Sequence, residues 1–178
     1  MKATVFDTET TGLILNRTVR QAMWPEVIEF SSATIDWDTL EELGDYTTLI
    51  KPSARITEDT TKVTGITNDM VHTAPSFRDV SERIRWTLES SDLVIAHNAS
   101  FDVEMLDMQL ERLRQPGMKW PRVICTVEQT VGMEGRRLTL GELHERLFGA
   151  KHEGAHRADA DVRALLRCVI RLKEDGRL

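Results

Sequence analysis

The sequence is poor in cysteine. Its two cysteines, Cys125 and Cys168, lie far apart in a chain of 178 residues. This spacing fits neither a disulfide framework nor the paired thiolates of a zinc site. We therefore expect the protein to work in a reducing, cytoplasmic compartment.

Long apolar runs are also lacking. No segment approaches the roughly 18 uninterrupted apolar residues that a membrane span requires. The first residues, MKATVFDTET, reach an acid by Asp7 and contain no apolar core of a secretory signal. Hydrophobic residues make up 40% of the chain and charged residues 29%, which are values typical of a globular protein. We expect a single domain over residues 1–178, without contact to a membrane.

Positive charge is in short supply. The 23 lysines and arginines are outnumbered by 29 aspartates and glutamates, so the net charge is -6. That sign disfavours a protein that grips long duplexes by neutralising phosphates. Any nucleic-acid contact must therefore be local. A site for two divalent cations would offset about four of the negative charges.

The pattern along the chain predicts an α/β domain with a mixed sheet. Short segments rich in β-branched and aromatic residues, bounded by Gly, Pro or Asp, predict strands at 2–7, 26–35 and 45–51. The second half predicts a helix at 75–90, a strand at 92–98, a helix at 101–115, a strand at 122–126, a helix at 139–148 and a last helix with an apolar stripe from Val162 to Ile170. The helix at 139–148 begins with a capping box, Thr139 and Glu142, and ends before Gly149. The stretch from Leu13 to Pro25, with Arg17, Arg20 and Trp24, is interpreted as a surface loop.

Two acids follow the first predicted strand. Asp7 and Glu9 come after the apolar residues 3–6. Residues i and i+2 of an extended chain point to one face, so both carboxylates would project together. Neighbouring like charges repel unless a proton or a cation intervenes, and Mg²⁺ or Mn²⁺ prefers such oxygen ligands. A solvated strand end that leads into a turn explains the same pair.

Further acids lie at two predicted helix starts. Asp102 comes one residue before the apolar stripe of its helix, and Asp161 has the same relation to the last helix. Asp159 competes with Asp161, and periodicity does not separate the two. Stabilisation by the helix dipole explains an acid at such a position equally well. His156 lies just upstream, where a loop would aim its ring at the same place, although a surface histidine is the alternative.

Three motifs carry a family resemblance. They are DTETTGL at 7–13, HNASFD at 97–102 and HRADAD at 156–161. Together, and in this order, they resemble the DEDDh 3′→5′ exonucleases, the DnaQ-like group that contains the proofreading subunits of bacterial replicative polymerases. The family's H-x4-D spacing selects Asp161 over Asp159. The resemblance implies a ribonuclease H-like fold, in which the first three strands are antiparallel, the later strands are parallel, and helices flank the sheet.

The resemblance also implies a chemistry. Asp7, Glu9, Asp102 and Asp161 would bind two Mg²⁺ ions, for which Mn²⁺ can substitute, and His156 would act as general base. The implied activity is metal-dependent hydrolysis at the 3′ end of single-stranded nucleic acid, with DNA favoured, to release nucleoside 5′-monophosphates. An exoribonuclease that trims RNA 3′ ends or short oligoribonucleotides is the alternative, because no residue type here announces a contact to the 2′-hydroxyl. The sequence does not identify a polymerase partner.

The loop after the first strand is expected to position the substrate. Thr10, Thr11 and Gly12 would offer backbone N–H groups to the terminal nucleotide. Leu13 resembles the family's wedge between the last two bases, and Phe101 is a candidate for stacking nearby. A plain packing role is the alternative for both.

A few cations flank the predicted site in the sequence. These cations are Arg136, Arg137 and Lys151. They would bind phosphates of the incoming strand, or they are simply solvent-exposed charges in the segments next to a helix. Because so few cations are present, we expect weak, salt-sensitive binding and distributive trimming.

Two other classes compete with the exonuclease interpretation. The segment from His152 to His156 matches the zinc-protease pattern H-E-x-x-H, which requires both histidines on one turn of a helix. Gly149 and Gly154 disfavour a helix there. A non-catalytic nucleic-acid or polymerase-binding module is the second rival. It is disfavoured because all five catalytic positions are present.

Overall fold

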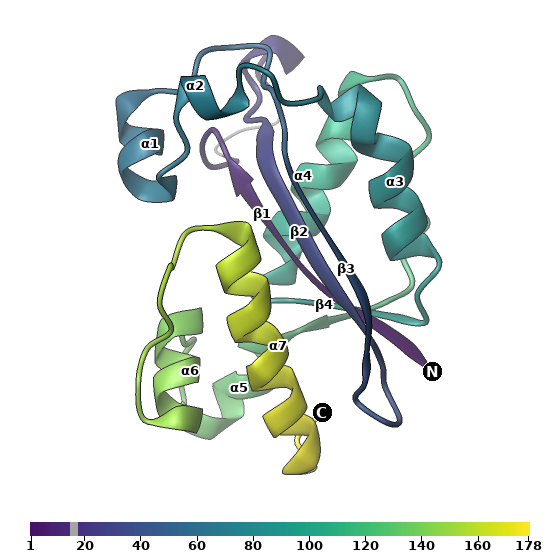
Figure 1. Ribbon diagram of the computed structural model, residues 1–178, viewed down its shortest axis with the longest axis vertical. Coiled ribbons are helices and arrows are strands. Elements are labelled where there is room, and N and C mark those ends of the chain that lie inside the picture. The colour runs from purple at the N-terminus through teal and green to yellow at the C-terminus, as the bar shows by residue number, and fades with distance from the viewer. Residues whose placement is uncertain (15–17) are drawn as a thin grey trace.

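One mixed sheet forms the centre of the molecule (Figure 1). The structure is a computed structural model that describes residues 1–14 and 18–178. Its strands lie in the order β3-β2-β1-β4-β5. The pairs β1–β2 and β2–β3 are antiparallel, and the pairs β1–β4 and β4–β5 are parallel. The bounds are β1 (Lys2–Thr10), β2 (Val27–Asp36), β3 (Glu42–Leu49), β4 (Leu93–Ala96) and β5 (Arg122–Cys125). This topology confirms the predicted ribonuclease H-like α/β fold.

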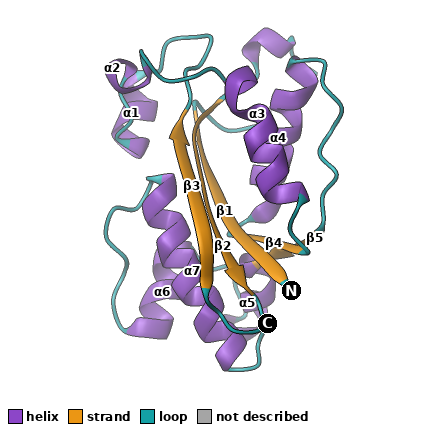
Figure 2. Ribbon diagram, turned by 45° about the vertical axis from the view of Figure 1, so that its right-hand side comes forward, coloured by secondary structure: helices purple, strands orange, loops and turns teal. Residues whose placement is uncertain are grey.

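Helices cover both faces of the sheet, as Figure 2 shows. One face packs against α3 and α4, and the other packs against α7, with α5 and α6 beside it. The short helices α1 and α2 lie beyond the end of β1 (Figure 1). The bounds are η1 (Gln21–Met23), α1 (Glu58–Thr64), α2 (Asn68–Val71), α3 (Phe77–Glu89), α4 (Ala99–Arg112), α5 (Thr126–Glu134), α6 (Leu140–Phe148) and α7 (Ala158–Glu174). Among the described helices, none is both long and apolar enough to cross a membrane.

The alternation of side chains along β1 connects the two layers. Ala3 and Val5 are fully buried in the cluster that includes the apolar stripe of α7. Phe6 is fully buried in the other cluster, with α3 and α4. Because the side-chain period of a strand is two, Asp7 and Glu9 continue the face toward α7, and the residue between them faces α4.

The end of β1 differs from the sequence prediction. The apolar pattern predicted that the strand would stop near Asp7, but β2 pairs with β1 as far as Thr10. Asp7 and Glu9 therefore lie inside a hydrogen-bonded strand and not in a turn after it. The last residues of β1 are polar, and they belong to the strand because their backbone pairs with β2. A pattern of apolar residues does not reveal such a strand end.

The sequence predicted some of the other helices and loops correctly and missed others. The capping box of Thr139 and Glu142 opens α6 as predicted, and Gly149, at φ +82°, ends it. The helices α1, α2 and α5 were not predicted. In the predicted loop from Leu13 to Pro25, Arg17 lies outside the described residues, Arg20 is exposed, and Trp24 is buried instead of lying on the surface.

Candidate active site

The two acids of the first motif lie on the part of β1 that extends beyond β4. β4 pairs with β1 from Ala3 to Val5, whereas β2 continues along its other edge to Thr10. Asp7 and Glu9 thus share a face of β1 next to an edge that no residue of β4 covers. The common face predicted for these two carboxylates is present in the structure.

Asp161 joins these two acids from the first turn of α7. One carboxylate oxygen from each of Asp7, Glu9 and Asp161 lies within 4.8 Å of the other two. We call these three side chains the carboxylate cluster. Asp159, the competing acid in the sequence, is exposed. The structure therefore brings together three of the four acids that were predicted to bind metal.

The fourth acid, Asp102, approaches β1 from the opposite face. It lies in the first turn of α4 and is 3% exposed. Its Oδ1 accepts hydrogen bonds from the backbone N–H of Thr8, at 3.0 Å, and from the Thr8 hydroxyl, at 2.7 Å. Asp102 is thus attached to the residue between Asp7 and Glu9. It lies beside the carboxylate cluster and not within it.

Burial and mutual repulsion change the acidity of these groups. Burial, followed by the charges of Asp102 and Asp161, raises the pKa of Asp7 well above its usual value. Burial, followed by the charge of Asp161, raises the pKa of Glu9 to about 8. Burial also raises the pKa of Asp102 to about 7, although its hydrogen bonds act in the other direction. Acids this crowded favour a proton or a cation, and a set of carboxylate oxygens suits Mg²⁺ or Mn²⁺. The residues present therefore fit a hard divalent cation.

His156 lies at the mouth of the site. His156 is exposed and has a left-handed backbone conformation, at φ +68°. Its backbone N–H donates to Oδ2 of Asp161, at 2.9 Å. Within residues 1–14 and 18–178, the imidazole of His156 has no hydrogen-bond partner. The ring is therefore held next to Asp161 by its backbone while both of its nitrogens stay available.

The segment that carries His156 is not helical. Residues 150–157 form bends and turns between α6 and α7, and Gly154 has φ +72°. A Cβ at Gly154 would lie 3.1 Å from that of Ala160, so this turn packs closely against α7. His152 and His156 therefore do not share a turn of helix. The zinc-protease interpretation is wrong for this reason.

An ion pair between a buried glutamate and a partly exposed arginine anchors the same segment to the sheet. Glu29, on β2 opposite Glu9, is 1% exposed. It accepts hydrogen bonds from Nη2 and Nε of Arg157, at 2.7 and 3.1 Å, and from the backbone N–H of Ala158, at 2.9 Å. Sequence reasoning missed this pair. The signal that could have identified it was an acid between the apolar residues Ile28 and Phe30.

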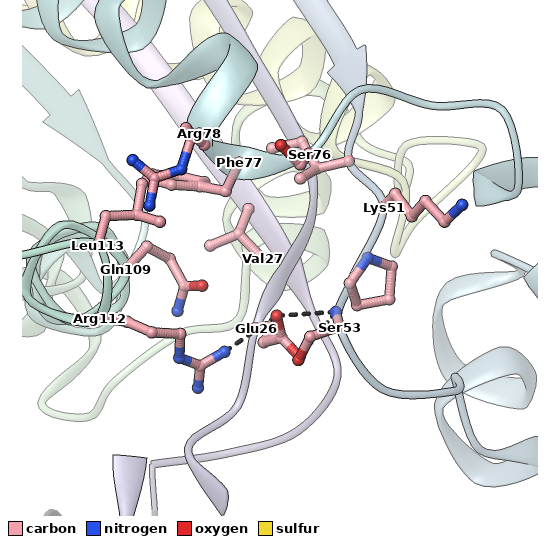
Figure 3. A pocket seen from close by; sticks show the side chains of 12 residues that line it. Glu26, Val27, Lys51, Ser53, Ser76, Phe77, Arg78, Gln109, Arg112 and Leu113 are labelled. Atoms are coloured by element: carbon pink, nitrogen blue, oxygen red, sulfur yellow. Dashed lines mark hydrogen bonds and ion pairs between the residues drawn. The ribbon is translucent and has the colours of Figure 1, made fainter. Parts of the chain in front are cut away.

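Hydrogen bonds join the loop after β1 to Glu26, just before β2, and to α1. The backbone N–H of Thr11 donates to the carbonyl of Glu26, at 2.8 Å, and the Thr11 hydroxyl accepts from the N–H of Glu26, at 2.9 Å. The Thr11 carbonyl accepts from the hydroxyl of Thr60, on α1, at 2.9 Å. Figure 3 shows the Glu26 carboxylate joined to Arg112 of α4 and to Ser53, beside a cavity of about 310 Å³. The prediction that Thr11 offers its N–H to a nucleotide is corrected, because that N–H is already bonded.

The other predicted substrate residues lie on or near this loop. Leu13 is 71% exposed, so its side chain is accessible to a ligand. Gly12 is exposed, and the Thr10 hydroxyl donates to the Gly12 carbonyl, at 2.8 Å. Phe101, in the first turn of α4, is half-buried against the core of that face. Gly12 and Leu13 are thus accessible to a substrate, whereas Phe101 is only partly so.

A cavity of about 600 Å³ extends from the carboxylate cluster. Arg137 and Lys151 line it, whereas Arg136 forms an ion pair with Glu142 outside it. His97 also lines the cavity, and burial lowers the pKa of its ring to about 4. The other lining residues are Asp7, Asn98, Val127, Leu138, Thr139, Leu140, Gly141, His152, Ala155, His156 and Asp161.

The sequence also matches a family of known enzymes. A family model described as an exonuclease, that of RNase T, matches residues 4–169. The chain belongs to this exonuclease family. It is a DnaQ-like enzyme of the DEDDh type, as the three motifs indicated. The family depends on metal ions, in agreement with the carboxylate cluster.

Relatives of this exonuclease include replication proteins. It is 32% identical over 167 residues to the DNA polymerase III subunit epsilon of Treponema pallidum, which covers 92% of this chain and 72% of that protein. It is 30% identical over 177 residues to the DNA polymerase III PolC-type of Lactococcus lactis, which covers 97% of this chain. The exonuclease spans only 10% of that second relative's length.

Solved structures share its fold at low sequence identity. The nuclease domain of 3'hExo, a DEDDh family member bound to rAMP, superposes with a TM-score of 0.81 at 19% identity and covers 98% of this chain and 92% of that one. Exonuclease X in complex with 5′ overhanging duplex DNA has a TM-score of 0.70 at 22% identity, with coverage of 98% and 93%. These similarities establish the fold of the exonuclease.

Proposed function

We propose that this exonuclease hydrolyses phosphodiester bonds at the 3′ end of single-stranded nucleic acid, with DNA preferred over RNA. The products would be nucleoside 5′-monophosphates. One observation carries the proposal: Asp7 and Asp161 of the carboxylate cluster line one open cavity together with His156. Acids and a base in this arrangement suit the attack of water on a phosphodiester.

The acids supply the binding site for the metal. We assign the binding of Mg²⁺, which Mn²⁺ can replace, to Asp7, Glu9 and Asp161. Asp102 would bind a second ion. When bound, such ions stabilise the charge that develops on the phosphate oxygens. Removal of the ions would leave buried carboxylates that repel one another, so activity and stability should both depend on the metal.

His156 would take the proton from the attacking water. Its ring is exposed and unbonded within the described part of the chain, while its backbone N–H is bonded to Asp161. His156 also lines the cavity that Asp7 and Asp161 line. A general base needs this combination of a fixed backbone and a free ring nitrogen.

The loop after β1 would hold the terminal nucleotide. We assign backbone contacts to Thr10 and Gly12, and insertion between the last two bases to Leu13. Phe101, half-buried at the start of α4, would contact the terminal base. Thr11 would act indirectly, by keeping the loop in place.

The remaining assignments rest on the relatives and on composition. The preference for DNA is supported by relatives whose names are DNA polymerase III subunit epsilon and DNA polymerase III PolC-type. A replicative polymerase is accordingly the partner that we propose. We also propose that residues 1–178 form a single domain, and that the enzyme is cytoplasmic, because Cys125 and Cys168 are free thiols.

A digestion assay with two labels tests the proposed function. Single-stranded DNA labelled at its 3′ end should release labelled mononucleotide at once in Mg²⁺, whereas a 5′ label should appear in mononucleotide last. EDTA and the variant Asp7→Asn should abolish both signals. Faster digestion of RNA of the same sequence would overturn the DNA preference, and early release of the 5′ label would overturn the polarity. Binding without digestion in Mg²⁺ or Mn²⁺ would favour the non-catalytic binding module.

A further inference from the structure

His152 contacts a predicted metal ligand directly, although it belongs to none of the three family motifs. Its Nε2 lies 2.6 Å from Oδ1 of Asp161. The other oxygen of Asp161, Oδ2, accepts from the backbone N–H of His156, at 2.9 Å. One turn of the chain, from His152 to His156, therefore holds both oxygens of this carboxylate.

The contact is enclosed by protein. The side chain of His152 is 6% exposed and that of Asp161 is 13% exposed. Gly154 packs against Ala160, so the turn cannot move away from the start of α7 without opening this contact. Hydrogen bonds to a carboxylate are stronger than those between neutral groups, and low polarity strengthens them further. The position of His152 relative to Asp161 is thus well defined.

The two nitrogens of the His152 ring have different surroundings. Nε2 faces a carboxylate oxygen, which accepts hydrogen bonds. Nδ1 is buried and has no hydrogen-bond partner among residues 1–14 and 18–178. A hydrogen on Nδ1 would leave a buried donor unsatisfied and would bring two lone pairs together at Nε2. The ring therefore carries its hydrogen on Nε2 and donates it to Asp161.

The ring of His152 packs near the ring of a second histidine. His144, on α6, is 4% exposed, and its ring centroid lies 5.8 Å from that of His152. Nδ1 of His144 lies 2.6 Å from the carbonyl of Ala150, at the start of the segment that leads to His152. Packing by α6 therefore restrains His152, which in turn restrains Asp161.

We propose that His152 is a positioning residue that orients the Asp161 carboxylate for metal binding with Asp7 and Glu9. This inference rests on the function proposed above. His152 acts as a hydrogen-bond donor to a ligand, and not as the zinc ligand that the H-E-x-x-H pattern suggested. Donors of this kind fix the rotamer of a metal-binding side chain, and their loss typically lowers metal affinity about 10- to 100-fold.

Binding of Mn²⁺ without nucleic acid tests the proposal. We would measure the Mn²⁺ affinity by calorimetry for wild type and for His152→Leu, His152→Gln and His152→Asn. Leucine removes the donor, and asparagine is too short to replace Nε2, so both should weaken binding about 10- to 100-fold. Glutamine can place an N–H near the position of Nε2 and should retain most of the affinity. Digestion by the leucine variant should recover as Mn²⁺ is raised, which a general loss of folding would not permit.

The outcomes separate this proposal from the proposed function. Equal Mn²⁺ affinities of wild type and folded His152→Leu would overturn the role of His152 and leave the nuclease function intact. If the leucine variant does not fold, the glutamine and asparagine variants decide, and equal affinities of these two would overturn the role. If wild type neither binds Mn²⁺ nor digests DNA, both proposals fall.

Discussion

Thr8 donates both its backbone N–H and its hydroxyl to a single oxygen of Asp102, at 3.0 and 2.7 Å. The bond joins the middle of β1 to the first turn of α4, beyond the point where β4 stops pairing. Asp102 accepts from the backbone N–H of Thr8, which lies past the residues of β1 that pair with β4. The two hydrogen bonds also keep this buried acid beside Asp7 and Glu9. The edge of the sheet and the proposed metal site thus depend on the same two residues.

Substitutions at these two positions should have opposite effects. Asp102→Asn retains an oxygen that can accept from Thr8 and removes a buried charge, so the metal-free protein should be at least as stable as wild type. Nuclease activity should fall at least about 100-fold, because metal ligands are charged acceptors. Thr8→Val removes one hydrogen bond, and should lower the unfolding free energy by about 1 kcal/mol while activity largely remains. Thermal unfolding in EDTA and digestion in Mg²⁺ measure both. A stable, active Asp102→Asn variant would show that this acid has no role in metal binding.

The stability of the metal-free protein should fall as the pH rises. The pKa of Asp102 is raised to about 7 and that of Glu9 to about 8, so the folded protein keeps protons that the unfolded chain has released. By linkage, this stabilisation is complete below the unfolded pKa values and is lost as the pH passes from about 4 to 8. We expect Tm in EDTA to drop between pH 5 and pH 8 by on the order of 5 to 10 °C. Mg²⁺ should restore most of this loss at pH 8, and a flat Tm profile in EDTA would contradict the predicted repulsion.

Leu13 should matter for substrate and not for folding. Its side chain is 71% exposed, so Leu13→Ala should change the unfolding free energy by less than about 0.5 kcal/mol. Burial of a leucine side chain between bases would contribute about 1.5 to 3 kcal/mol, so KM for single-stranded DNA should rise by roughly 10-fold or more. Leu43→Ala is a matched control, because Leu43 is 57% exposed and lies on β3, at the other end of the sheet. Equal KM values for the two variants would remove Leu13 from the substrate site.

The sequence was sufficient for the features that depend on local periodicity and on motif order. Strand alternation placed Asp7 and Glu9 on one face, and the capping box placed the start of α6. Periodicity alone could not choose between Asp159 and Asp161, since both lie in the first turn of α7. The spacing in the third motif made that choice, and the structure places Asp161 in the carboxylate cluster.

The contacts between distant segments could not be predicted in the same way. Glu29 pairs with Arg157, which is 128 residues away, and nothing in the sequence identifies this partner. His152 stood out only as part of the H-E-x-x-H pattern, and its contact with Asp161 depends on the fold of the turn before α7. The bonded N–H of Thr11 is similar, because its acceptor, Glu26, follows a long loop. Local patterns identify which residues can do chemistry, whereas the groups that hold those residues in place come from tertiary structure.

The ion pair between Glu29 and Arg157 offers a test of how the His156 segment is held. Glu29 is 1% exposed, so Arg157→Ala would leave its carboxylate buried and poorly compensated. We expect a loss of about 1 to 3 kcal/mol in unfolding free energy, because Glu29 loses two charge-assisted hydrogen bonds but keeps the one from the N–H of Ala158, and Arg157 is itself 37% exposed. Activity should also fall, since Arg157 is adjacent to His156.

The double variant Glu29→Gln, Arg157→Ala removes the buried charge and should recover a large part of the lost stability without recovering the activity. Urea unfolding of wild type, both single variants and the double variant, together with kcat from digestion assays, gives the coupling energy directly. Additive losses of stability in the double variant would show that the two side chains do not act as a pair.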